Sequence, residues 1–257
     1  MSGILFTIDE NVANITLNRP QVFNSFNRTM ALALQSALDE CKSDTIRAVR
    51  IIGEGKAFCA GQDLQEVTDP NGPSLTTILQ EHYNPIIERI RNLQKPVVAA
   101  VNGVAAGAGA NIALACDIVV VAQSAAFIQA FSKIGLIPDS GGTFFLPRII
   151  GFQKAAALMM LGDKISADEA NSLGMCYKVL PNENFDADTL AITKKLAQMP
   201  TYGLWLTKQA LNASMNNNLT QQLDLEDQLQ TLAGTSHDYK EGVNAFLEKR
   251  AANFIGK

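Results

Sequence analysis

FCAGQDL, residues 58–64, is matched further along the chain by GVAAGAGAN, residues 103–111. Each stretch follows an apolar, strand-like run and leads into a helical pattern. Glycine tolerates a positive φ and lets the backbone approach a ligand, while the first turn of a helix offers free N–H groups with partial positive charge. Two such turns facing each other would stabilise an oxygen atom that becomes negative during a reaction. We therefore predict an oxyanion hole made by the backbone N–H groups of Gln62 and Ala108.

Size and composition place the chain among globular proteins. Its 257 residues are 47% hydrophobic and 18% charged, which fits one large domain or one domain with a helical appendage. The net charge of −4 offers no basic surface to a nucleic acid. The N-terminus lacks a basic segment and a small-residue cleavage site, so we predict a cytoplasmic protein. Residues 96–116 are weakly apolar and contain Asn102 and Asn111, which fits strand, turn and helix better than a membrane span.

The apolar patterns predict repeated units of two strands and a helix. Residues 28–43 have apolar side chains at helical spacing, with charged residues alongside. The short links between units indicate a spiral of such units, and not a doubly wound nucleotide fold. Gly103, Gly107 and Gly109 do not have the spacing of a dinucleotide fingerprint. Predicted strands span residues 4–8, 12–17, 48–52, 97–101, 117–122 and 126–129, and a further helix spans 75–94.

After Gly141 the pattern is mostly helical. Ser166 and Glu169 have the spacing of a capping box that opens a helix, and Pro200 separates two further helices. The turn-rich residues 68–74 are either a mobile flap over a pocket or a plain surface loop. Predicted C-terminal helices span residues 201–215, 219–232 and 236–249.

These motifs resemble the enoyl-CoA hydratase/isomerase (crotonase) superfamily. The resemblance covers nearly the whole chain, and within the superfamily it is strongest to the isomerases that act on the ring epoxide in bacterial phenylacetate degradation. It implies an α/β crotonase fold, a ClpP-like spiral of ββα units over residues 1–198. A C-terminal helical trimerisation region over 199–257 would follow, giving a homotrimer or a dimer of trimers. The segments that carry the resemblance are residues 17–20, 58–64, 101–110, 130–133, 135–143 and 239–243.

The resemblance also implies a coenzyme A thioester as substrate, with no permanently bound cofactor and no metal. The adenine and phosphate groups would lie near Asn24, Phe26 and Lys56, with a solvent-exposed lysine as the alternative for Lys56. Asp63 reads as a helix cap that supports the oxyanion hole. Residues 60–64, namely Ala60, Gly61, Gln62, Asp63 and Leu64, would contact the pantetheine end and the thioester.

One carboxylate is placed by the motifs in the acyl pocket. Asp139 reads as a proton shuttle, with capping of a helix over residues 141–149 as the alternative. Relatives that hydrate double bonds use two glutamates, and the motifs place Asn111 and Phe131 at those positions. Asn111 can orient substrate or water but cannot shuttle a proton. Phe131 either faces an unsaturated acyl group or simply packs in the core.

The sequence does not indicate a cysteine or serine nucleophile. The scattered cysteines form no metal or redox motif, and neither His82 nor His237 pairs with a serine as a hydrolytic triad requires. The cysteines are Cys41, Cys59, Cys116 and Cys176.

A single carboxylate beside an oxyanion hole suits proton transfer between two carbons. The resemblance therefore implies an acyl-CoA isomerase. It would convert 2-(1,2-epoxy-1,2-dihydrophenyl)acetyl-CoA to oxepin-CoA, shift 3-enoyl-CoA to 2-enoyl-CoA, or do both. The alternatives are an enoyl-CoA hydratase and a non-catalytic subunit that binds acyl-CoA.

Overall fold

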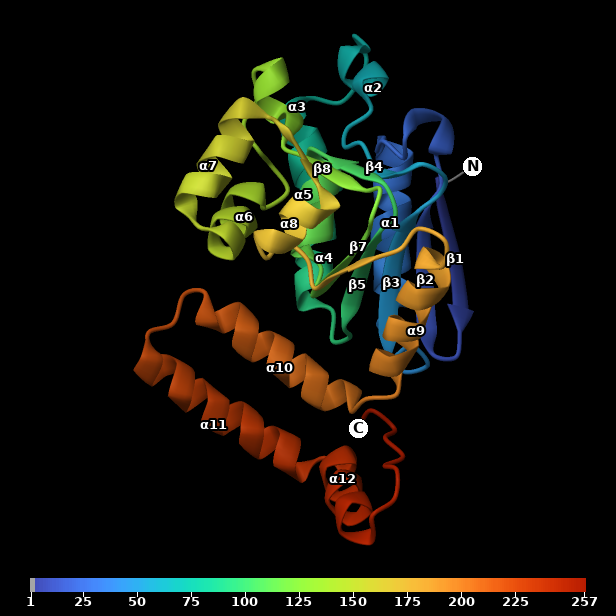
Figure 1. The fold of residues 1–257 in the computed structure, drawn as a ribbon, viewed down its shortest axis with the longest axis vertical. Helices are drawn as coiled ribbons and strands as arrows, with labels where there is room; N and C mark the ends of the chain where they lie inside the picture. Colours follow the sequence, from blue (N-terminus) through green and yellow to red (C-terminus); the bar gives the residue numbers. More distant parts are fainter. Residues whose placement is uncertain (1–2) are drawn as a thin grey trace.

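The larger of two β-sheets lies in the upper right of the view in Figure 1, with β1 at its outer edge. The structure is a computed structural model that describes residues 3–257. The sheet has the strand order β1-β2-β3-β5-β7-β10, in which only β1 and β2 pair antiparallel. The strands are β1 (Ile4–Asp9), β2 (Val12–Leu17), β3 (Ala48–Gly53), β5 (Val97–Val101), β7 (Ile118–Ala122) and β10 (Lys178–Leu180).

A second sheet has four short strands in the order β4-β6-β8-β9. Strands β3, β5 and β7 of the large sheet each lead directly into a short strand of this second sheet. The chain thus repeats a strand–strand–helix unit, which confirms the predicted spiral. The short strands are β4 (Ala57–Cys59), β6 (Val104–Ala106), β8 (Ala126–Ile128) and β9 (Lys164–Ser166).

The first hairpin and the central strands follow from their sequences. Glu10 and Asn11 have positive φ values of 46° and 65°, the left-handed conformation that joins antiparallel strands through a tight turn. Every residue of β3 and β5 is buried, as expected for parallel strands covered on both faces. The predicted strands are confirmed here, whereas β9 and β10 lie in a part of the sequence whose pattern is mostly helical.

The segment predicted as one helix over residues 75–94 has a different geometry in its middle. It consists of α3 (Leu75–Thr77), a π-helical segment η2 (Ile78–Tyr83) and α4 (Asn84–Asn92). A π-helical turn holds an extra residue, and such turns are frequent at functional sites. Here both His82 and Tyr83 at the end of η2 are buried.

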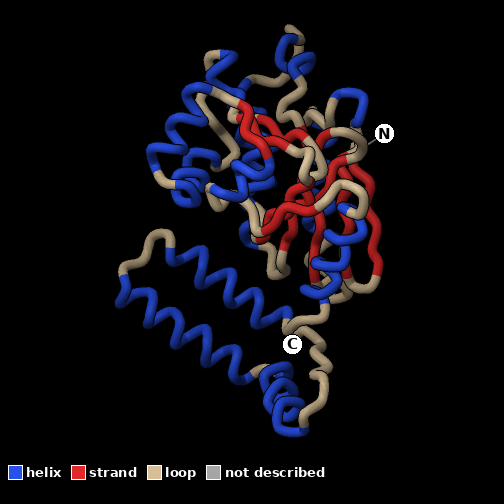
Figure 2. Tube along the Cα trace, in the orientation of Figure 1, coloured by secondary structure: helices blue, strands red, loops and turns tan. Residues whose placement is uncertain are grey.

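Helices cover the sheets on both sides, and three of them extend away (Figures 1 and 2). Helix α1 (Arg28–Glu40) begins at Asn27, whose side chain accepts a hydrogen bond from the Met30 N–H, and it ends earlier than the predicted residue 43. Ser166 caps α8 by accepting from the Glu169 N–H. The other helices are α2 (Leu64–Thr68), α5 (Ala108–Ala115), α6 (Gly142–Ile150), α7 (Phe152–Leu161), α8 (Ala167–Ser172), α9 (Phe185–Ala197), α10 (Thr201–Ser214), α11 (Leu219–Thr235) and α12 (His237–Glu248), with 3₁₀ turns at η1 (Pro20–Val22) and η3 (Ala130–Ile134).

Helices α10, α11 and α12 form the extension after Pro200, and the C-terminal tail runs back from α12 toward the start of α10. Arg47 ties this tail to the sheet region, because its guanidinium donates to the Phe254 carbonyl at 2.6 Å. Within residues 3–257, no helix combines the length and apolar character needed to cross a bilayer.

Candidate active site

The first glycine turn, residues 60–63, is held from beneath by the segment before α1. The Phe26 N–H donates to the Gly61 carbonyl at 2.7 Å, and the Asp63 N–H donates to the Phe26 carbonyl at 2.8 Å. The Asn24 amide donates to the Ala57 carbonyl at 2.8 Å. The side chains of Asn24 and Phe26 are 0% and 1% exposed. They support the turn from within the protein and do not line the cavity that it borders.

Asp63 has the structural role that its position predicts. Its carboxylate accepts from the Gln65 N–H at 3.1 Å, which caps α2, and pairs with Arg19 at 2.9 Å. Lys56 is exposed, and it makes no ion pair within residues 3–257. Its side chain is therefore free to meet an anionic group at the surface.

The second glycine turn packs directly against the first. Gly61 has a φ of +92°, and a Cβ there would lie 3.4 Å from the Ala108 nitrogen and 3.0 Å from the Ala106 carbonyl oxygen. A Cβ at Gly109 would lie only 2.3 Å from the Cys59 carbonyl oxygen. The glycines thus allow the two turns to touch without side chains between them.

The two predicted oxyanion donors meet at this contact. Ala108 is the first residue of α5, whose N-terminal N–H groups have no intrahelical acceptor. Neither the Gln62 nor the Ala108 N–H donates to another backbone group within the described residues 3–257. Both residues line the same cavity. Both N–H groups are therefore unpaired with other backbone groups beside one cavity, which is the property that an oxyanion hole would need of its donors.

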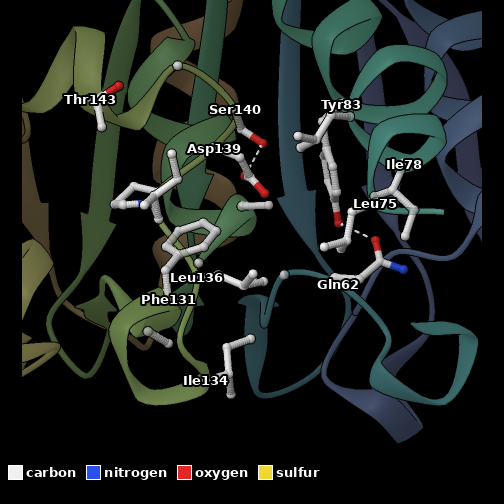
Figure 3. A pocket seen from close by; sticks show the side chains of 18 of the residues that line it. Gln62, Leu75, Ile78, Tyr83, Phe131, Ile134, Leu136, Asp139, Ser140 and Thr143 are labelled. Carbon is white, nitrogen blue, oxygen red and sulfur yellow. Dashed lines mark hydrogen bonds between the residues drawn. The ribbon is translucent and has the colours of Figure 1, made fainter. Parts of the chain in front are cut away.

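The cavity beside the donors has a volume of about 640 Å³ and is mostly apolar. Figure 3 shows aliphatic and aromatic side chains around it, with Asp139 and Tyr83 facing each other across the opening. Such a space suits an acyl group whose orientation is set by a few polar groups. The lining residues are Ala60, Gly61, Gln62, Leu64, Leu75, Ile78, Leu79, Tyr83, Asn84, Gly107, Ala108, Ala130, Phe131, Lys133, Ile134, Leu136, Ile137, Pro138, Asp139, Ser140, Gly141 and Thr143.

Asp139 directs its carboxylate into this cavity (Figure 3). Ser140 and Gly141 follow with positive φ values of 51° and 74°, a sharp turn that ends the loop at the start of α6. Gly141 occupies the cap position of α6, and no side chain caps that helix. The alternative in which the Asp139 side chain caps the helix is therefore wrong.

The surroundings of Asp139 favour proton transfer. Burial raises the pKa of its carboxyl above the ordinary value of 3.8, and a hydrogen bond from the Ser140 hydroxyl at 2.8 Å lowers the pKa by a smaller amount. A carboxylate with a raised pKa is a stronger base, which is the property that proton removal from carbon requires.

The side chain of Asn111 bonds to other groups of the protein and does not line the cavity. Its side chain is fully buried. Its amide donates to the Asp139 main-chain carbonyl at 2.9 Å, and its carbonyl accepts from the Gln129 amide at 2.8 Å. Asn111 therefore anchors the loop that carries Asp139, and it is not among the residues that line the cavity.

Phe131 packs in the interior and also borders the cavity. It is 7% exposed and so belongs to the interior, and it also lines the cavity. A Cβ at Gly107 would lie 3.8 Å from the Phe131 ring. The ring thus covers the second glycine turn at the place where hydrating relatives are expected to carry a carboxylate.

Tyr83 and the side chain of Gln62 are the polar groups that the sequence pattern does not reveal. The Tyr83 hydroxyl donates to the Gln62 carbonyl oxygen Oε1 at 2.9 Å (Figure 3). The Tyr83 ring packs edge-on against Phe26 with centroids 5.9 Å apart. Burial raises the pKa of Tyr83 well above 10.0, so that the phenol stays protonated. In sequence, Tyr83 is only one aromatic residue within a helical pattern.

The chain is similar over its full length to proteins of known family. It matches the enoyl-CoA hydratase/isomerase family over residues 7–257. It is 48% identical to the 1,2-epoxyphenylacetyl-CoA isomerase of Escherichia coli K12, covering 100% of both chains. It is 44% identical to a protein described as a probable enoyl-CoA hydratase from Rhodobacter capsulatus, covering 99% of this chain and 98% of the relative.

Solved structures agree with the sequence match. The crystal structure of an enoyl-CoA hydratase from Bacillus anthracis superposes with a TM-score of 0.92 at 32% identity, covering 99% of this chain and 100% of that chain. The shared fold is the crotonase fold. With a family match over almost the whole sequence and a relative at 48% identity, the chain belongs to the enoyl-CoA hydratase/isomerase family of enzymes.

Proposed function

We propose that this enzyme is an acyl-CoA isomerase with Asp139 as its proton shuttle. The observation that carries the proposal is the presence of one carboxylate in the cavity, opposite two unpaired backbone donors. Asn111 and Phe131 stand at the two positions where hydrating relatives would hold a water between glutamates. One acid–base group suits moving a proton from one carbon to another, whereas adding water calls for a group that activates the water.

The reaction proceeds through an enolate. The thioester oxygen accepts hydrogen bonds from the Gln62 and Ala108 N–H groups, which stabilise the negative charge that develops on it. The Asp139 carboxylate removes a proton from the carbon next to the thioester, and the electron pair of that C–H bond moves toward the oxygen. The carboxylic acid then returns the same proton to a more distant carbon as the double bond shifts. No atom is gained or lost.

The acyl group of the substrate follows from the cavity and from the relative in Escherichia coli. That relative is a 1,2-epoxyphenylacetyl-CoA isomerase, and the mostly apolar cavity of about 640 Å³ has room for a ring beside Phe131. We therefore propose 2-(1,2-epoxy-1,2-dihydrophenyl)acetyl-CoA as substrate and oxepin-CoA as product. In this conversion the bond between the two epoxide carbons also breaks, so that its electrons enter the ring double bonds and the six-membered ring becomes a seven-membered one. A 3-enoyl-CoA would undergo the proton shift alone, to a 2-enoyl-CoA.

The coenzyme A portion is proposed to lie along the first glycine turn. Ala60, Gly61 and Gln62 offer backbone groups at the cavity, and Leu64 adds an exposed apolar side chain there. Lys56 is placed to give a point charge to a phosphate. Asn24 and Phe26 would act indirectly, by supporting the turn from within.

Hydration is the second candidate, because the relative from Rhodobacter capsulatus is described as a probable hydratase. Two substrates separate the candidates in deuterated buffer. An isomerase moves the double bond of a 3-enoyl-CoA, incorporates deuterium when the shuttled proton exchanges with solvent, and leaves crotonyl-CoA unhydrated. Rapid hydration of crotonyl-CoA would instead establish the hydratase and show that another group activates water. Binding of both thioesters without conversion of either would indicate a non-catalytic subunit.

A further inference from the structure

Gln62 is unusual within the site because its backbone and its side chain are held by different partners. Its backbone N–H is one of the two proposed oxyanion donors. On either side of it, the Gly61 carbonyl and the Asp63 N–H are both bonded to the main chain of Phe26. The Gln62 side chain points the other way, toward α2 and η2, where it meets Tyr83 and Glu66 (Figure 3).

The side-chain contacts form a continuous chain of hydrogen bonds. The Tyr83 hydroxyl donates to Gln62 Oε1 at 2.9 Å, and Gln62 Nε2 donates to Glu66 Oε2 at 2.9 Å. The other Glu66 oxygen accepts from the Arg28 backbone N–H at 2.8 Å. Both ends of the Gln62 amide are therefore used, and the orientation of the amide is fixed by one donor and one acceptor.

Tyr83 is the most deeply buried member of this chain of bonds. Its side chain is 1% exposed, and its ring is packed edge-on against Phe26, the residue whose main chain holds the same turn. A hydrogen-bond network with a buried member and paired polar groups favours one arrangement of its members. Tyr83 thus touches the oxyanion turn through a side-chain hydrogen bond and through a ring contact.

We propose that Tyr83 is a positioning residue for the oxyanion hole, acting through the side chain of Gln62 to keep the Gln62 N–H aimed at the thioester oxygen. The inference rests on the proposed function, since it concerns the same hole. A donor contributes to catalysis only when it points at the place where the charge develops. Without the Tyr83 hydroxyl, Gln62 Oε1 would lose its hydrogen-bond donor, and the backbone of the turn at Gln62 could shift.

A double-mutant cycle tests the inference on a 3-enoyl-CoA substrate. The variants are Tyr83→Phe, Gln62→Met and the combination of both. Tyr83→Phe keeps the ring packed on Phe26, and Gln62→Met keeps the backbone N–H and the side-chain length. We expect either single change to lower kcat by about tenfold with little change in KM, because a misplacement of about 1 Å can cost about 10²-fold and a smaller shift should cost less. Tyr177→Phe, at a side chain that is 67% exposed, is the matched control and should leave kcat unchanged.

The combination decides the route by which Tyr83 acts. Residues that act as one unit are not additive, so Tyr83→Phe should have no further effect once Gln62 is methionine. A full additional loss in that background would mean that the hydroxyl contacts the substrate itself and would overturn the inference, as would an unchanged kcat in Tyr83→Phe. Should Tyr83→Phe fail to fold, as circular dichroism would reveal, Gln62→Met alone must still show the loss of kcat.

Failure of the proposed function is distinguishable from failure of this inference. If the wild-type enzyme does not move the double bond, the isomerase assignment fails while the hole remains testable. Exchange of the α-hydrogens of a saturated acyl-CoA into deuterated water depends on enolate stabilisation and on Asp139, but not on the later proton return. The same cycle measured by that exchange rate must show the same non-additivity, and additive losses would refute the role of Tyr83.

Discussion

The two walls of the cavity present their reactive groups in opposite ways. On the Asp139 wall, residues 130–143, a side chain is the reactive group, and the buried Asn111 amide holds its backbone. On the Gln62 wall, residues 60–64 and 75–84, the proposed reactive group is a backbone N–H, and its turn is held by the main chain of Phe26 and by side-chain bonds to Gln62. At position 139 the chemical nature of the side chain therefore matters for the reaction, whereas at position 62 the placement of the backbone matters. Substitutions that change the side chain's chemistry should therefore act most strongly on the Asp139 wall, and substitutions that shift the backbone on the Gln62 wall.

The largest effect should come from replacing the carboxylate of Asp139. Asp139→Asn keeps the shape but cannot accept a proton, so we expect kcat for 3-enoyl-CoA isomerisation to fall by about 10²–10⁴-fold, the usual range for acid–base groups. Binding of coenzyme A, measured by calorimetry, should be unchanged. Isomerisation at the wild-type rate by this variant would rule out Asp139 as the shuttle.

Asp139 should also set the acid limb of the pH–rate profile. The carboxylate must be deprotonated to remove a proton, and burial raises its pKa above 3.8. The value of kcat/KM should therefore fall with decreasing pH at a higher pH than an ordinary aspartate would give. An acid limb at or below 3.8 would contradict the raised pKa.

The contact between the two glycine turns should be the next most sensitive feature. In Gly109→Ala the new Cβ would lie 2.3 Å from the Cys59 carbonyl oxygen and 2.7 Å from its sulfur, so α5 must move and carry the Ala108 N–H with it. We expect kcat to fall by about 10²–10³-fold, the cost of losing one oxyanion donor. Thermal unfolding should also occur at a lower temperature, because overpacking a core costs about 1–3 kcal/mol.

A glycine elsewhere provides the control for that substitution. Gly234 lies in α11, and a Cβ there would meet nothing within 4 Å. Gly234→Ala should leave kcat unchanged and stabilise the helix slightly. If Gly109→Ala behaved like Gly234→Ala, the close approach of the two turns would have no part in catalysis.

Substituting Asn111 should displace the backbone of the Asp139 wall while leaving the Asp139 carboxylate itself chemically unaltered. Asn111→Leu has similar volume but removes the bonds to the Asp139 carbonyl and to Gln129, so we expect kcat to fall about ten- to hundredfold as the loop shifts. Asn111→Glu would place a negative group against the Asp139 carbonyl and lose activity as well. It should not hydrate crotonyl-CoA, because Phe131 still occupies the second position. Full activity of Asn111→Leu would show that the loop needs no anchor.

On both walls the sequence predicts the proposed reactive group better than the residue that supports it, for a physical reason. The two turns, the donors Gln62 and Ala108, and Asp139 depend on local signals, namely glycines and helix starts next to apolar strands. The sequence motifs place Asn111 near the acyl pocket, but its contact with the Asp139 carbonyl depends on how α5 meets a loop 28 residues away. Tyr83 reaches the site because η2 is π-helical, and a helical pattern over residues 75–94 gives no sign of that geometry. Strands β9 and β10 are equally non-local, since their pairing partners lie far away in the chain.

The smallest effect should be on stability, and it should depend on pH in a defined direction. The folded protein binds the Asp139 proton more tightly than the unfolded chain does, because burial raises the pKa of the folded state. This group therefore contributes stability below its ordinary pKa of 3.8, and that contribution is lost as the pH rises through the folded value. Asp139→Asn does not titrate, so its free energy of unfolding should exceed that of the wild type by an amount that grows from pH 4 upward and then levels off.

Urea unfolding at a series of pH values measures this difference directly. At the lowest pH the two proteins should unfold at nearly the same urea concentration, since a protonated aspartate resembles asparagine. A difference that shrinks with rising pH would mean that the carboxylate is stabilised in the folded state. The Asp139 wall would then resemble the Gln62 wall, in which each polar group in the chain of bonds already has its partner. If the difference in free energy of unfolding grows with pH, the enzyme keeps a carboxylate that destabilises the folded state, at a position where the reaction needs a carboxylate.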